Sequence, residues 1–362
     1  MIKGAILYTT SSCNLNCAYC FVEKKNDTMR PETLIRIMEW LQKNISAEHD
    51  HHVSVMGGEP MLYPDLIYKL ADLTRKIKYS GKSLRLKGIP TNGSILDKDI
   101  IKSLKEKNIR LDFSLDGYTL YSNRLRFKDK KIFGRILNNL AVYTREIGAP
   151  VIKMTVHPDT AKFMHNEIAL FHKNKIDKIQ VMPAHGVSWG KRNTDEFMAN
   201  FKKVLALHKK LKKSPQPLFI DPIDIYCKNI SENDWEKTNC NCGLGEEIVF
   251  TPSGDAYACT LIMHLRDSKL KDELYLGNVY RKIDLGKMRR LKGYRICSLA
   301  KINCRYLFPD ITCKKICALY DFRAKKMLDI RQAKNLIDIQ NFMFHETYSE
   351  YFTRKNTDGV TA

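Results

Sequence analysis

Short apolar runs alternate with longer amphipathic segments from residue 4 to about residue 212 of this 362-residue chain. The longer segments carry apolar side chains at helical spacing, as Leu66, Ile67, Leu70 and Leu73 show. This alternation predicts successive β-α units around a parallel sheet. We expect strands at 4–9, 52–56, 83–89, 109–115, 150–156 and 178–183. We expect helices at 31–45, 64–78, 96–107, 130–147, 160–174 and 194–212.

Six β-α units are two short of a closed eight-fold barrel, so the predicted fold class is α/β, a partial (β/α)6 TIM-like barrel. Pro215 and Pro217 then interrupt a basic helix, and the composition shifts toward cysteine. A C-terminal cysteine-rich α+β domain is therefore expected. The expected boundaries are 1–212 for the barrel, 213–222 for a linker, 223–327 for the cysteine-rich domain, and 328–362 for a C-terminal helix and tail.

Charge and the N-terminal segment narrow the function classes. The formal net charge of +21 favours phosphate-bearing partners, but the excess is spread over predicted helix faces, as at Lys105, Lys107, Lys209 and Lys210. We interpret it as a solvated surface and expect no nucleic-acid partner. The brief N-terminal apolar run predicts neither a signal peptide nor a membrane span. We expect a cytoplasmic protein whose 11 cysteines are metal or cluster ligands.

Three cysteines follow the first predicted strand with the spacing C-x3-C-x2-C, at Cys13, Cys17 and Cys20. An iron-sulfur cube held by three thiolates leaves one iron with an open coordination position. Thiolates are soft ligands that favour iron-sulfur clusters or zinc, and zinc sites usually arrange their ligands as two spaced pairs. The triplet therefore predicts an iron-sulfur cluster that binds a further ligand.

This triplet, with the aromatic Tyr19 before the third cysteine, resembles the signature of the radical S-adenosylmethionine (SAM) enzymes. The resemblance implies a [4Fe-4S] cluster whose open iron binds the amino and carboxylate groups of SAM. It also implies that one electron from the cluster cleaves SAM to a 5′-deoxyadenosyl radical, which abstracts hydrogen from the substrate.

Further distinctive segments, at 57–60, 90–93 and 114–117, follow the next three predicted strands. Ligands gather at this end of parallel strands. Gly57 and Gly58 would let the backbone approach a ligand, beside the Glu59 carboxylate, which accepts from ammonium groups. In the radical SAM family the matching Gly-Gly-Glu-Pro segment holds the amino group of SAM.

Ser-Leu-Asp-Gly at 114–117 resembles a motif of peptide-modifying family members, in which a downstream arginine grips SAM. Arg126 stands about where that arginine belongs, and Arg124 is the alternative. The catalytic acid or base is not fixed by the sequence, and the candidates are Asp116, Tyr118 and His157. The cofactor contacts that the resemblance implies are Tyr19, Phe21, Gly57, Gly58, Glu59, Pro60, Asn92, Ser114, Arg126 and Val181.

The cysteine-rich part resembles a SPASM or twitch domain, the auxiliary-cluster extension of many radical SAM enzymes. Its opening is Cys242-x11-Gly254-x4-Cys259, in which 250–259 predicts a hairpin that turns at 252–255. The later SPASM run is altered, because Leu307 stands at its second cysteine position. The resemblance groups Cys317 with Cys242, Cys259 and either Cys240 or Cys227.

Eight cysteines lie in the C-terminal half, enough for two four-thiolate clusters, so one or two auxiliary [4Fe-4S] clusters are expected. A zinc ribbon is the alternative for this region. The full set of candidate metal ligands is Cys13, Cys17, Cys20, Cys227, Cys240, Cys242, Cys259, Cys297, Cys304, Cys313 and Cys317.

The resemblance implies an oxidoreductase that modifies a peptide or protein side chain by crosslinking or oxidation, with auxiliary-cluster electron transfer. Sulfatase-maturating members carry an aspartate after the cysteine aligned with Cys259, where this chain has Thr260, so formylglycine formation is not expected. The expected electron donor is of the flavodoxin or ferredoxin type. A leader peptide would be recognised either by a separate leader-peptide-binding protein or by the surfaces of the domains themselves. The alternatives are a radical SAM enzyme acting on a small-molecule intermediate, and a basic nucleic-acid-binding or RNA-modifying metalloprotein.

Overall fold

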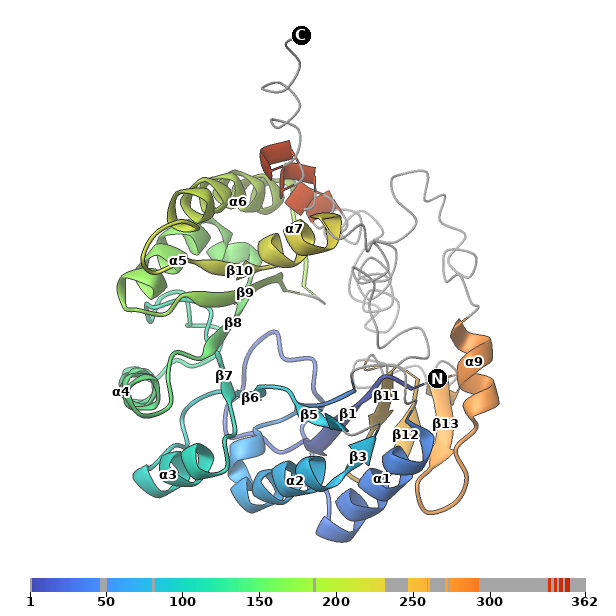
Figure 1. Ribbon diagram of the computed structural model, residues 1–362. Coiled ribbons are helices and arrows are strands. Elements are labelled where there is room, and N and C mark those ends of the chain that lie inside the picture. The colour runs from blue at the N-terminus through green and yellow to red at the C-terminus, as the bar shows by residue number, and fades with distance from the viewer. Residues whose placement is uncertain are drawn as a thin grey trace. The chain divides into compact units, whose positions relative to one another are not determined.

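The computed structural model describes residues 2–45, 51–79, 82–184, 187–231, 247–258, 260, 271–272, 274–292 and most positions from 338 to 351 (Figure 1). The chain divides into two compact units. Unit 1 is formed by Met1–Phe113, Asp129–Gly148 and Cys240–Ile302, and unit 2 by Ser114–Lys128, Ala149–Asn239 and Asn303–Ala362.

Unit 1 is built on a six-stranded sheet with the strand order β13-β12-β11-β1-β2-β5. The central strand β1 is parallel to both of its neighbours, and β12 and β13 extend the β11 edge as antiparallel strands. The strands are β1 (Gly4–Thr10), β2 (His52–Gly57), β5 (Arg85–Leu86), β11 (Glu247–Phe250), β12 (Asp255–Tyr257) and β13 (Tyr275–Asn278).

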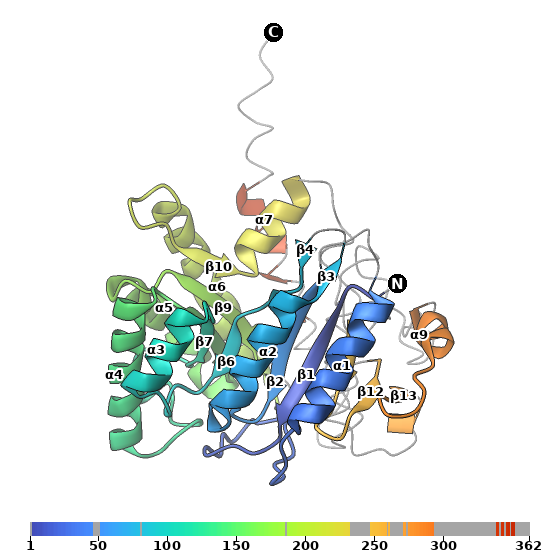
Figure 2. The same cartoon turned by 60° about the horizontal axis from the view of Figure 1, so that its bottom comes forward.

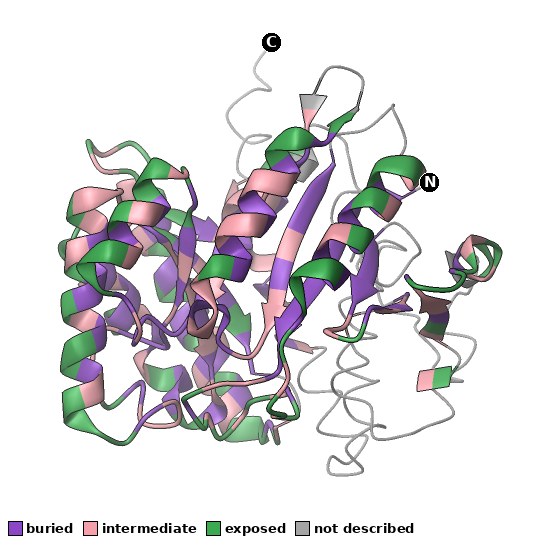
Figure 3. Cartoon of the chain, turned by 90° about the horizontal axis from the view of Figure 1, so that it is seen from below, coloured by how far each residue is buried: buried purple, intermediate pink, exposed green. Residues whose placement is uncertain are grey.

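The core of unit 1 lies around β1, in which all seven residues are buried (Figure 3). Such a strand needs cover on both faces, which explains its nearly continuous apolar sequence. Helices α1 (Pro31–Asn44) and α2 (Pro64–Lys76) cover one face of the sheet (Figure 2). In α1, buried apolar side chains recur at helical spacing and form the face that packs inward: Leu34, Ile37, Met38 and Leu41.

The rest of unit 1 adds a second parallel pair, a short hairpin and four helices. Strand β6 (Ile89–Thr91) pairs in parallel with β7 (Leu111–Ser114). The other elements are the hairpin of β3 (Lys78–Tyr79) and β4 (Lys82–Ser83), the 3-10 helix η1 (Pro60–Leu62), α3 (Lys98–Glu106), α4 (Lys130–Glu146) and α9 (Leu285–Lys292).

Unit 2 contains three parallel strands, β8 (Val151–Val156), β9 (Lys178–Pro183) and β10 (Phe219–Asp221). Its helices are η2 (Pro158–Phe163), α5 (Met164–Lys173), α6 (Lys191–Leu211) and α7 (Ile223–Ser231). His208 on α6 joins two other helical segments of this unit. Its ring forms hydrogen bonds with the hydroxyl of Tyr351, near the C-terminus (2.6 Å), and with the carboxylate of Asp224 on α7 (2.7 Å).

The predicted β-α alternation is confirmed, with the third expected strand divided into β5 and β6. The hairpin turn at 252–255 is also confirmed, with Gly254 at φ +83°. The expected linker, 213–222, instead contains β10, because Ile220 is buried and Phe219 pairs with Lys178 on β9. The helix expected at 328–352 is described only at helical positions from 338 to 351. Among the helices that the structure describes, none is long and apolar enough to cross a membrane.

Candidate active site

The cysteine loop, residues 11–28, leaves the end of β1 and returns beside it. Asp27 closes this loop, because its carboxylate accepts from the backbone N–H of Ser11 (2.7 Å) and from the Ser11 hydroxyl (3.3 Å). The N–H of Met29 also donates to the Thr9 carbonyl (2.7 Å). The base of the loop is therefore fixed to β1 at both ends, and no sequence pattern indicates this role for Asp27.

The three cysteines of the loop differ in exposure: Cys13 and Cys17 are half-buried, and Cys20 is exposed. Burial raises the pKa of Cys13, while the Leu15 N–H, 3.5 Å from its sulfur, and the Lys24 ammonium lower it. Within the described residues, no three His, Cys, Asp or Glu side chains are arranged to hold a metal ion. Three soft thiols on one anchored loop nevertheless fit an iron-sulfur cluster by the chemistry of the donor set.

The Gly-Gly-Glu segment at the end of β2 lies against the cysteine loop. The N–H of Gly58 donates to the Thr10 carbonyl and that of Glu59 to the Ser12 carbonyl, both at 2.8 Å. Gly57 has φ +123°, and a Cβ atom on Gly58 would lie 1.9 Å from the Ser12 carbonyl oxygen. The backbone approaches closely at both glycines, to Thr10 at the end of β1 from Gly57 and to Ser12 of the cysteine loop from Gly58. Their contact with a cofactor stays a prediction.

The Glu59 carboxylate, predicted to accept from an ammonium group, is only 2% exposed. It accepts from the Met61 N–H (3.0 Å), the Thr91 hydroxyl (2.8 Å) and the Asn92 N–H (2.6 Å). Burial raises its pKa, and these three hydrogen bonds oppose that shift. Glu59 thus joins the end of β2 to the end of β6, and Pro60 begins η1 directly after it.

The Asn92 side chain, predicted to contact the cofactor, belongs to a ring of three hydrogen bonds. Its Nδ2 donates to Asn14 Oδ1 (2.8 Å), Asn14 Nδ2 donates to Ser94 Oγ (2.8 Å), and Ser94 Oγ donates to Asn92 Oδ1 (2.6 Å). Asn14 and Ser94 are not among the predicted site residues. Their positions, next to Cys13 and two residues after Asn92, are the only signals for them in the sequence.

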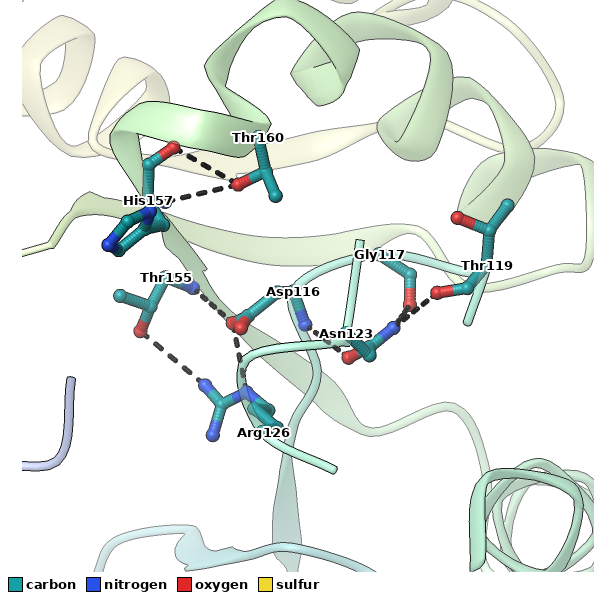
Figure 4. A network of polar contacts seen from close by, with 8 residues as sticks. All are labelled: Asp116, Gly117, Thr119, Asn123, Arg126, Thr155, His157 and Thr160. Atoms are coloured by element: carbon teal, nitrogen blue, oxygen red, sulfur yellow. Dashed lines mark hydrogen bonds and ion pairs between the residues drawn. The ribbon is translucent and has the colours of Figure 1, made fainter. Parts of the chain in front are cut away.

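In unit 2, Asp116 and Arg126 form a buried ion pair at the end of β7 (Figure 4). Asp116 Oδ1 lies 2.9 Å from Arg126 Nε and accepts from the Thr155 N–H (3.1 Å). The alternative arginine, Arg124, stacks on the exposed Tyr121 ring, 4.1 Å from its centroid. Of the two arginines, Arg126 is therefore the one held in a buried polar network.

The other two acid-base candidates have structural contacts. His157 caps η2, because its Nδ1 accepts from the Asp159 N–H (3.2 Å), and burial lowers the pKa of the imidazole. Tyr118 packs edge-on against Phe171, and its N–H donates to the buried Glu167 carboxylate (2.6 Å). These contacts hold both residues in place and assign neither of them a proton-transfer step.

The remaining predicted residues lie on several elements. Val181 is buried in β9, whereas Ser114, Tyr19 and Phe21 are half-buried. Cys227 lies in α7, where burial raises its pKa to about 11. The other candidate auxiliary ligands lie outside the described residues, at Cys240, Cys242, Cys259, Cys297, Cys304, Cys313 and Cys317.

Comparisons with known proteins show which proteins the chain is similar to. Residues 7–162 match the model of the radical SAM superfamily. The chain is 26% identical over 266 residues to an uncharacterised protein of Methanocaldococcus jannaschii, covering 71% of this chain and 85% of that protein. It is 33% identical over 116 residues to the cysteine-type anaerobic sulfatase-maturating enzyme of Clostridium perfringens, covering 30% of this chain and 31% of that enzyme.

A solved structure extends the likeness to the whole chain. Native anSMEcpe with bound AdoMet and Cp18Cys peptide matches with a TM-score of 0.71 and 19% identity, covering 98% of this chain and 99% of that one. The likeness shows a shared fold and confirms the predicted fold class. Residues 7–162 therefore form a radical SAM domain, and the chain is related in sequence to the anaerobic sulfatase-maturating enzymes.

Proposed function

We propose that the chain modifies a peptide or protein side chain by radical chemistry. A [4Fe-4S] cluster with SAM would supply one electron and a 5′-deoxyadenosyl radical that removes hydrogen from the substrate. The observation that carries the proposal is the cysteine loop, fixed against the Gly-Gly-Glu segment inside a radical SAM domain. The peptide substrate is supported by the peptide bound to anSMEcpe, which shares the fold.

The chain's own residues would take distinct parts in this reaction. Cys13, Cys17 and Cys20 would hold the cluster. Arg126, fixed by Asp116, would offer a guanidinium to a carboxylate, the group for which its planar fork is suited. These roles use the anchored cysteine loop and the Asp116–Arg126 pair described above.

We further propose that the C-terminal cysteines bind one or two auxiliary clusters that accept an electron from the substrate. Thr260 stands where the related maturases carry their aspartate, so the proposed product is a crosslink or oxidation other than formylglycine. The net charge of +21 suits an acidic electron donor of the flavodoxin or ferredoxin type. A separate protein would recognise the leader part of the substrate.

The test uses the full chain, purified and reconstituted without oxygen, with SAM, a reductant and candidate peptides deuterated at side-chain carbons. We expect 5′-deoxyadenosine that carries deuterium, and a peptide that has lost hydrogen, both measured by mass spectrometry. Cys17→Ala should abolish 5′-deoxyadenosine formation. If 5′-deoxyadenosine acquired deuterium only when small molecules were the deuterated substrates, the peptide assignment would be contradicted. If no 5′-deoxyadenosine formed at all, the whole proposal would be contradicted.

A further inference from the structure

Both chain neighbours of Cys13 are fastened to one hydrogen-bonded network. On one side the Ser12 carbonyl accepts from the Glu59 N–H (2.8 Å), and on the other side Asn14 Oδ1 accepts from Asn92 Nδ2 (2.8 Å). The two anchors are themselves joined, because the Asn92 N–H donates to Glu59 Oε2 (2.6 Å). The chain at Cys13 is therefore held between two connected points at the ends of β2 and β6.

The Asn14 half of this network is a closed ring in which each side chain donates and accepts. Ser94 fixes the orientation of the Asn92 amide, because both its N–H (2.9 Å) and its hydroxyl (2.6 Å) donate to Asn92 Oδ1. Asn92 and Ser94 are each 7% exposed, whereas Asn14 lies on the exposed loop. The ring is buried on the Asn92 and Ser94 side, where hydrogen bonds are shielded from water, and Asn14 is its link to the loop.

We propose that Asn14 is a positioning residue for the cluster-binding loop. The ring holds Asn14, and with it the neighbouring Cys13, in a fixed position against the end of β6. The loop is therefore preorganised before a cluster is inserted. The inference rests on the proposed function in taking the cysteine loop as the cluster site. It assigns Asn92 a role in supporting the loop, using both polar atoms of its side chain.

Three variants test the ring. Asn14→Ala removes two of its three bonds from the loop side, and Ser94→Ala removes two from the β6 side, two residues beyond Asn92. Asn14→Asp keeps the acceptor for Asn92 and loses the donor to Ser94. The matched control is Asn16→Ala, which changes an exposed asparagine of the same loop that lies outside the ring.

The first readout is hydrogen exchange of residues 11–20 in the cluster-free chain, measured by mass spectrometry. Asn14→Ala and Ser94→Ala should each speed exchange roughly tenfold relative to Asn16→Ala, as expected for the loss of one or two net hydrogen bonds. The exchange rate of Asn14→Asp should lie between those of Asn14→Ala and the Asn16→Ala control. The double variant should not exceed Asn14→Ala, because that substitution already removes both bonds from the loop to the ring.

The second readout is the rate of iron loss from the reconstituted chain to a chelator, which should rise in the same order. The urea midpoint of each variant should stay at the control value, so that a local effect is separated from general unfolding. Exchange and iron loss like those of Asn16→Ala, or additive effects in the double variant, would overturn the inference. If the variants showed the predicted exchange rates but the reconstituted wild type formed no 5′-deoxyadenosine, only the proposed function would be overturned.

Discussion

Replacing Gly58 with alanine tests the contact between the Gly-Gly-Glu segment and the cysteine loop. The new Cβ atom would lie 1.9 Å from the Ser12 carbonyl oxygen and 2.6 Å from its carbon. Both atoms belong to the backbone, so no rotation of a side chain relieves the clash. Reaching an ordinary contact of about 3.4 Å requires the cysteine loop to move by about 1.5 Å.

That movement would break the 2.8 Å bond by which the Glu59 N–H holds the Ser12 carbonyl of the loop. This bond contributes about 1 kcal/mol net, and the residual crowding costs about 1–3 kcal/mol more. We therefore expect Gly58→Ala to lower the free energy of unfolding by about 3 kcal/mol. The expected iron content after reconstitution also falls, because the displaced loop carries all three cysteines.

The assay is urea unfolding followed by circular dichroism, with iron content measured on the same samples. The matched control is Gly134→Ala, which lies exposed in α4 with no atom within 4 Å of the added Cβ. Alanine should stabilise that helix by about 0.5–1 kcal/mol. The reasoning would be refuted if Gly58→Ala were as stable as Gly134→Ala and retained normal iron.

Three further substitutions test other parts of the site. Glu59→Gln places an amide donor among three protein donors and should cost about 1–3 kcal/mol in urea unfolding, so wild-type stability would contradict the assigned acceptor role. Asp116→Asn removes the buried partner of Arg126 and should cost about 3–5 kcal/mol, and a change below about 1 kcal/mol would show that the pair is solvated. Burial lowers the pKa of His157, so its stabilisation is present above a pH of about 6.5 and is lost as the pH falls. His157→Asn keeps a capping acceptor without a titrating group and should lose less stability than the wild type on acidification, and an equal loss would contradict this.

The sequence predicted the elements of the fold because parallel strands and the helices that cover them leave separate apolar periodicities. It did not predict that β11 pairs with β1, with Glu247 beside Gly4, because hundreds of residues separate the two strands and no local pattern specifies their pairing. Strand β10 was missed for a related reason: its three residues lie close behind two prolines that indicated a linker.

The contact between the strand-end loops was predicted better than the partners of individual side chains. Consecutive β-α loops meet at one edge of a parallel sheet, which explains why Gly58 and Glu59 contact the cysteine loop as expected. The partners of individual side chains depend on loops distant in the sequence. The bonds of the Asn92 amide to Asn14 and Ser94 therefore could not be predicted, and its contact with the cofactor stays a prediction.

The central claim is that Cys13, Cys17 and Cys20 hold the cluster that cleaves SAM. Its most direct test is the quantity of 5′-deoxyadenosine formed from SAM after reduction of the anaerobically reconstituted chain, with Cys227→Ala and the triple variant Cys13→Ala/Cys17→Ala/Cys20→Ala compared with the wild type. We predict 5′-deoxyadenosine from the wild type and from Cys227→Ala, and none from the triple variant. Equal formation by the triple variant and the wild type would contradict the account.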